Sequence, residues 1–98
     1  MNYLYVKNLN GTSRYKPKFD DSWLEGWERI KNKEAIFCHS CFCKKTDEDL
    51  VGAHVQKNTE YDNKWYIIPF CKKCNNKNSD ELFFVKEDEL VLVNEIND

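Results

Sequence analysis

The sequence predicts a small α+β domain, and three observations lead to this expectation. The chain has 98 residues, enough for one domain. Short runs rich in β-branched and aromatic residues accompany one amphipathic segment, a pattern typical of several strands and one main helix. Two C-x2-C pairs stand in polar, turn-like sequence and indicate a metal site. A chain of this length buries only about 60–70% of its unfolded surface, so a bound metal would help to stabilise it.

The N-terminal third predicts a strand, an irregular arm and a helix. Residues 3–6 are rich in β-formers, whereas residues 7–20 contain turn formers, cations and a proline. A capping-box pattern, S-x-x-E, begins at Ser22 and predicts a helix over 23–32. The helix carries its apolar residues on one face, which we expect to pack on the metal-binding part: Trp23, Leu24, Trp27 and Ile30.

The spacing of the cysteines indicates a structural zinc ion. The chain has five cysteines, an odd number, and no export signal precedes them, so we expect a reducing, cytoplasmic setting without disulfides. Each C-x2-C turn presents two sulfurs to one side, and two turns complete a tetrahedral shell. The predicted ligands are Cys38, Cys41, Cys71 and Cys74.

Two more residues of this segment are assigned other roles: His39 lies within the first pair, and Cys43 follows it. Cys43 is expected to be a bystander two residues along the turn, and the alternative is that it replaces Cys41 as a ligand. His39 is expected to face solvent. Since structural zinc contributes roughly 10–16 kcal/mol in small domains, folding and metal binding should be coupled.

The remaining chain predicts two hairpins around the second pair of cysteines. The first cysteine turn occupies 37–42, and its successor opens a short helix at 72–79. The predicted strands are 50–56 with 65–70, and a C-terminal β-hairpin of 82–85 with 90–93. A cysteine turn, a hairpin and a second turn at a helix start define a treble-clef zinc module. We therefore expect a single domain, 1–98, with an N-terminal part (1–36), a zinc core (37–79) and an acidic end (80–98).

The stretch from Cys38 to Lys77 resembles the HNH or ββα-metal nucleases, including the endonuclease VII-like resolvases. The matching motifs are the two C-x2-C pairs, GAHV at 52–55 and YIIPF at 66–70. The resemblance implies a ββα zinc module in which His54 is the general base and Asn75 ligates a second, catalytic divalent cation. Two positions depart from the family pattern: Ala53 replaces the acid that binds this cation, and Tyr66 replaces the asparagine that orients the base.

This departure weakens the catalytic interpretation. A hard divalent ion prefers anionic oxygen ligands, and Asn75 with a neutral His54 would hold Mg²⁺ poorly. Without the ion, charge that builds on phosphate is not neutralised. A replacement carboxylate would have to come from elsewhere, and the candidates are Glu60, Asp62 and Asp80.

The charge is divided along the chain. Residues 1–79 carry 14 basic and 10 acidic side chains, whereas residues 80–98 carry one lysine and seven acids. Basic residues in the first part could form a face for phosphates, with Tyr15 and Phe19 between them. These candidates for nucleic-acid binding are Arg14, Lys16, Lys18, Lys72, Lys73 and Lys77.

Three functions follow from these features. The favoured one is a non-catalytic zinc module that binds DNA, RNA or a protein partner. The second is a divalent-metal-dependent endonuclease that uses His54, and the third is an accessory or inhibitor protein of a phage or mobile element. No apolar run approaches the roughly 20 residues that cross a bilayer, so we expect no membrane partner.

Overall fold

A five-stranded antiparallel sheet forms the centre of the protein in the computed structural model, which describes residues 2–9, 12, 15–46, 48–77 and 81–98. The strand order is β4-β1-β2-β3-β5. The strands are β1 (Tyr3–Asn8), β2 (Leu50–Lys57), β3 (Tyr66–Cys71), β4 (Leu82–Lys86) and β5 (Val91–Leu92). The helices are α1 (Trp23–Lys31), α2 (Lys72–Asn75) and α3 (Val93–Asn97), with a 3-10 turn, η1 (Glu87–Glu89). The predicted α+β class is confirmed.

The sheet is strongly curled, and its inner face holds one of two hydrophobic clusters. Strands β3 and β4 are separated by two other strands, yet the rings of Phe70 and Phe83 lie 5.0 Å apart. Val6, Val55 and Ile68 alternate with outward-facing neighbours and are fully buried in the same cluster. The buried cysteines of the two C-x2-C pairs join this cluster, so the four-cysteine group lies against the inner face.

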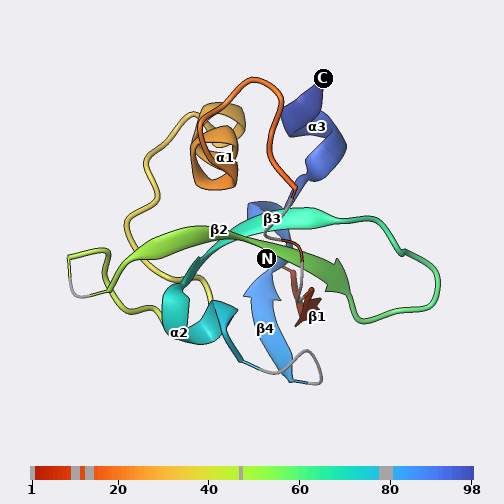
Figure 1. Ribbon diagram of the computed structural model, residues 1–98. Helices are drawn as coiled ribbons and strands as arrows, with labels where there is room; N and C mark the ends of the chain where they lie inside the picture. The colour runs from red at the N-terminus through yellow and green to blue at the C-terminus, as the bar shows by residue number, and fades with distance from the viewer. Residues whose placement is uncertain (1, 10–11, 13–14, 47, 78–80) are drawn as a thin grey trace.

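Helix α1 covers part of the outer face, over strands β2 and β3, and α3 lies beside α1 and contacts β5 (Figure 1). The second hydrophobic cluster lies between them and includes Trp27, Ile67 and Ile96. The Trp27 indole N–H donates to the Glu89 carbonyl oxygen at 2.8 Å, which ties α1 to η1. The outer face of β1 and β4 lies beyond these helices, and its side chains are exposed.

The predicted N-terminal elements form nearly where the sequence places them. Helix α1 begins after Ser22, whose hydroxyl accepts from the Glu25 backbone N–H at 3.1 Å. It ends at Asn32, which adopts the left-handed conformation, with φ at 55°. Gly52 allows the close approach of α1 to β2, since a Cβ atom there would lie 2.6 Å from the Leu24 backbone nitrogen.

The central hairpin is also confirmed, with β2 and β3 paired from Leu50↔Cys71 to Val55↔Tyr66. Pro69 lies inside β3, opposite Gly52. Its carbonyl oxygen accepts from the His39 backbone N–H at 2.9 Å, so its ring nitrogen also points away from β2. The missing donor therefore leaves the β2–β3 ladder intact.

Two predictions about the C-terminal half are wrong. The C-terminal β-hairpin does not form: β4 pairs with β1 and β5 pairs with β3, at opposite edges of the sheet. The physical reason is that β1 and β3 offer open ladders, whereas η1 turns the chain away after Lys86. Helix α2 begins at Lys72 as expected, but it ends at Asn75, well short of residue 79.

Candidate functional site

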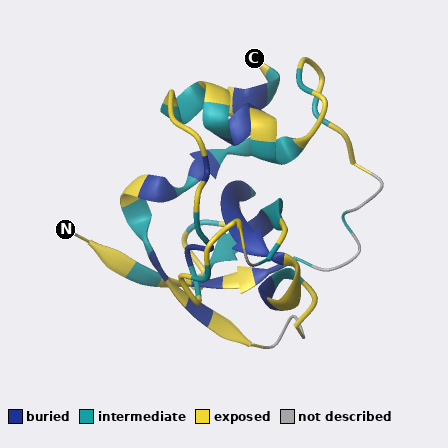
Figure 2. Ribbon diagram, turned by 90° about the vertical axis from the view of Figure 1, so that its left-hand side faces the viewer, coloured by how far each residue is buried: buried dark blue, intermediate teal, exposed yellow. Residues whose placement is uncertain are grey.

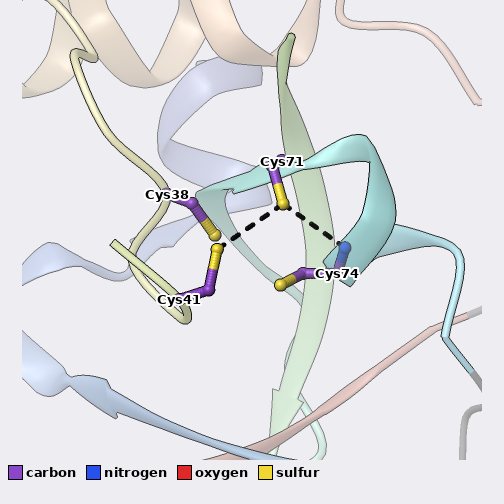
Figure 3. A group of neighbouring side chains, drawn as sticks. All are labelled: Cys38, Cys41, Cys71 and Cys74. Atoms are coloured by element: carbon purple, nitrogen blue, oxygen red, sulfur yellow. Dashed lines mark hydrogen bonds between the residues drawn. The ribbon is translucent and has the colours of Figure 1, made fainter. Parts of the chain in front are cut away.

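Four sulfur atoms meet where the first cysteine turn approaches the end of β3. The Sγ atoms of the four predicted ligands all lie within 4.8 Å of one another: Cys38, Cys41, Cys71 and Cys74 (Figure 3). The Sγ atoms of Cys41 and Cys71, which come from different pairs, are 3.8 Å apart. In a tetrahedral site with Zn–S bonds of about 2.3 Å, neighbouring sulfurs lie about 3.8 Å apart. The four cysteines could thus hold a metal ion such as zinc.

Backbone geometry prepares both turns for this arrangement. The Ser40 backbone N–H donates to the Cys38 sulfur at 3.4 Å, and the Cys74 N–H donates to the Cys71 sulfur at 3.5 Å. The first turn is closed by two hydrogen bonds between Cys38 and the residues Phe42 and Cys43. Closure requires φ of 64° at Phe42, a conformation that costs a bulky residue about 1–2 kcal/mol.

The thiols are coupled through hydrogen bonds. Burial raises the pKa of Cys38 and of Cys74. Burial acts in the same direction on Cys41, but hydrogen bonds from Cys43 and the neighbouring thiols lower its pKa to about 6. Cys41 is also the exposed member of the four. A metal ion that binds here must displace the protons from the other thiols, so affinity should fall as the pH falls.

Cys43 and His39 lie in different surroundings. Cys43 is half-buried and lies outside the group of four sulfurs, and its hydrogen bond to Cys41 raises its pKa to about 12. The expectation that His39 faces solvent is wrong, since only 8% of the residue is exposed. Its ring lies 4.7 Å from that of Phe37 and 5.8 Å from that of Trp27, because the turn packs against α1.

A second site lies over the sheet, on the opposite side of β2 from the inner face. A cleft of about 480 Å³ there is lined by both residues of the predicted catalytic pair, His54 and Asn75. The N-terminal arm supplies Thr12 and Lys16, and the start of α1 supplies Trp23. The arm is held in place by the Trp23 indole N–H, which donates to the Tyr15 carbonyl oxygen at 3.0 Å.

The imidazole of His54 is packed rather than open to solvent. Its ring lies 4.9 Å from that of Trp23 and 5.7 Å from that of Trp65, both edge to face. The Thr12 hydroxyl lies within hydrogen-bond distance of the Leu9 carbonyl oxygen, at 3.2 Å, and of the His54 Nδ1, at 3.3 Å. The Nε2 atom is buried without a partner among the described residues. Burial lowers the pKa of His54 to about 4.

The positions that depart from the nuclease pattern do not face this cleft. Ala53 and Tyr66 point to the inner face, opposite to His54, as strand alternation and register require. The Tyr66 hydroxyl donates to the Asp62 carboxylate at 2.6 Å. Asn75 lines the cleft, and its carbonyl oxygen accepts from the Asn8 side-chain amide at 2.6 Å.

The carboxylate that lines the cleft is not one of the three candidates. Glu60 and Asp62 line a different hollow beside the end of β2, and Asp80 lies outside the described residues. Asp21 lines the cleft instead. Sequence reasoning missed it because Asp21 reads as a helix-start residue, and only the packing of α1 on β2 brings it near His54.

The predicted nucleic-acid-binding residues come from the N-terminal arm and from α2 with the segment after it. The lysines of α2 and the segment after it lie near carboxylates: Lys72 with Asp49 at 3.5 Å, Lys73 with Glu48 at 4.0 Å, and Lys77 with Glu81 at 3.8 Å. Lys16 lines the cleft, and Lys18 is exposed near the end of α3. Arg14 lies outside the described residues.

Comparisons of this chain with protein-family models, curated proteins and solved structures found no match. The helices in the described part of the chain are all too short or too polar to span a bilayer.

Proposed function

We propose that the protein is a zinc-stabilised binding module that does not catalyse phosphodiester cleavage. The observation that carries this proposal is the gathering of four sulfurs, within 4.8 Å, against the larger hydrophobic cluster. A zinc ion there would link the first cysteine turn to the β3–α2 corner, two segments about thirty residues apart in sequence. The fold of a chain with a core this small would then depend on the ion.

The geometry of His54 supports a non-catalytic role. A general base must reach the water molecule that it activates. The Nδ1 atom of His54 lies 3.3 Å from the Thr12 hydroxyl, and Nε2 is buried beside aromatic rings, without a partner among the described residues. A pKa of about 4 also makes the imidazole a weak base at neutral pH. The residue is better suited to hold the arm against the sheet than to abstract a proton.

One observation favours the second candidate, a divalent-dependent nuclease. Asp21, His54 and Asn75 line the same cleft, so a carboxylate, an imidazole and an amide lie around one space. If the arm moved away, an ion held by Asp21 and Asn75 would be the required cofactor. The two candidates therefore differ in whether these side chains matter for cleavage.

Incubation of the zinc-loaded protein with supercoiled plasmid and Mg²⁺, Mn²⁺ or Ni²⁺ separates them. We expect nicking no faster than the buffer control. Nicking by the wild type that disappears in both His54→Ala and Asp21→Asn, with zinc content unchanged, would establish the nuclease. A variant that loses both nicking activity and bound zinc has unfolded instead. Zinc is therefore measured in each sample.

A further inference from the structure

The outer face of β1 and β4 carries a cluster of exposed aromatic rings that neither the metal site nor the cleft uses. Tyr3 and Tyr5 on β1 and Phe84 on β4 are 47%, 52% and 52% exposed. Figure 2 shows exposed and buried residues alternating along the strand that begins at the N-terminus. The inward neighbours fill the core, so these three rings are not part of it. We refer to them as the aromatic face.

The rings of the aromatic face form one continuous surface. Tyr5 pairs directly with Phe84 in the register of β1 and β4. The Phe84 ring stacks on Tyr3 at 5.4 Å with an interplanar angle of 19°, and it lies 4.9 Å from Tyr5. A hollow of about 360 Å³ borders all three rings and is also lined by Asn58 and Thr59. Flat rings beside amide and hydroxyl groups offer both stacking and hydrogen bonding to a planar ligand.

Two lysines lie on the same outer face as the rings. Lys7 pairs with Leu82 and Lys86 pairs with Tyr3, so strand alternation places both lysines on the outer face. Within the described chain, neither lysine makes an ion pair. The carboxylates of Asp62 and Glu87, at the neighbouring end of β2, are both engaged by Lys57. A polyanion would therefore meet two available cations beside the rings.

The exposed rings and the two lysines together favour one class of ligand for this sheet face. In a duplex the bases are stacked on one another, whereas unpaired bases can stack on protein rings. A second copy of the chain would fit less well, because a two-fold contact brings the same surface against itself and would gather four lysines. The lysines thus favour a ligand with phosphates, and the rings favour one with unpaired bases.

We propose that the aromatic face binds single-stranded nucleic acid, with bases stacked on Tyr5 and Phe84 and phosphates near Lys7 and Lys86. This inference rests on the proposed function, since it names the partner of the zinc-stabilised module. It does not use the basic residues expected from the sequence, because those lie on other elements.

Fluorescence anisotropy with labelled ten-nucleotide oligo(dT), oligo(rU) and a DNA hairpin duplex tests this proposal. We expect binding of the single strands, weaker binding of the duplex, and affinity that falls as salt rises. Tyr5→Ala and Phe84→Ala should each weaken binding by about fivefold or more. Tyr61→Ala is the matched control, since Tyr61 is 90% exposed in the β2–β3 loop and should leave affinity unchanged.

The lysines are tested in the same way. Lys7→Glu and Lys86→Glu should weaken binding and flatten its salt dependence, whereas Lys45→Glu, in the exposed segment after the first cysteine turn, should not. The proposal is wrong if single strands do not bind, or if Tyr61→Ala weakens binding as much as Tyr5→Ala. It is equally wrong if the wild type forms a dimer that Phe84→Ala dissociates. Zinc content of each sample separates these outcomes from failure of the zinc module itself.

Discussion

At the scale of single residues, the five cysteines divide into four that gather in one group and one that lies outside it. Cys38 is fully buried in the sulfur group, whereas Cys43 lies outside it and is half-buried. The sequence indicated this division from spacing alone. It could not show that Cys43 would hydrogen-bond to Cys41, because that contact depends on the left-handed turn at Phe42.

Replacement of these two cysteines by serine should have unequal effects. Cys38→Ser should lose most bound zinc and lower Tm by more than about 10 °C, since about 4–8 °C accompany each kcal/mol in a domain of this size. Cys43→Ser should keep the zinc and cost about 1 kcal/mol or less. Metal analysis and thermal unfolding measure both effects. Equal loss of zinc in the two variants would contradict the assignment of ligands.

His54 makes stability depend on pH in a defined direction. Burial lowers its pKa from 6.5 to about 4, so between these values the unfolded chain binds a proton that the folded chain does not. The contribution of the neutral imidazole to the free energy of unfolding is fully present above about pH 6.5. It falls by about 3 kcal/mol as the pH drops toward 4.

The comparison of wild type with His54→Gln isolates this effect from protonation of the thiols. The variant should lose less stability between pH 7 and pH 4, as measured by urea unfolding. An NMR titration of the His54 ring should show a midpoint near 4. A midpoint near 6.5 would mean that the ring is exposed and that the arm does not cover it.

At the scale of elements, the docking of α1 on β2 shapes the cleft. Gly52 permits this contact, because a Cβ atom there would lie 2.6 Å from the Leu24 nitrogen and 2.8 Å from the Trp23 carbonyl carbon. These are backbone atoms, so relief requires movement of the helix. Residues at the start of α1, Asp21 and Trp23, line the cleft beside His54 and would move with it.

Gly52→Ala should therefore cost about 2 kcal/mol or more and change the tryptophan fluorescence. Gly26→Ala is the comparison: its Cβ would meet the side chain of Ile96, rather than backbone, at 2.5 Å. The better helix propensity of alanine offsets part of that cost. Urea unfolding measures both variants, and an equal or smaller loss in Gly52→Ala would contradict the close packing of α1 on β2.

Local signals predicted the local elements. The cap at Ser22, the apolar face of α1 and the alternation in β2 and β3 are written within short windows, and each formed within about two residues of its expected position. The partners of β4 and β5 are not local properties. Both strands looked like a hairpin, but they pair with β1 and β3 instead.

The candidate site shows the same limit. The four cysteines could be named from spacing, whereas Asp21, Thr12 and Trp23 come together with His54 only through the arm and α1. The aromatic face was also hidden, because Tyr3, Tyr5 and Phe84 belong to strands that are far apart in sequence. Their common exposure follows from a pairing that the sequence did not reveal.

At the scale of the whole molecule, the four-cysteine group lies at the open end of the central hairpin, where β3 ends at Cys71. The first cysteine turn reaches β3 through a hydrogen bond from His39 to Pro69, and α2 follows β3 directly. Two hydrophobic clusters lie on opposite faces of the curled sheet, and a chain this short buries only a limited apolar area in them. A zinc ion would add roughly 10–16 kcal/mol to that, more than either cluster alone supplies.

Thermal unfolding of the reduced protein, before and after removal of metal by a strong chelator, tests this dependence most directly. The zinc-loaded protein, with one equivalent of zinc per chain, should show one cooperative transition. The stripped protein should show none, and added zinc should restore it. A stripped protein that melts cooperatively near the same temperature would show that the fold does not depend on the four sulfurs.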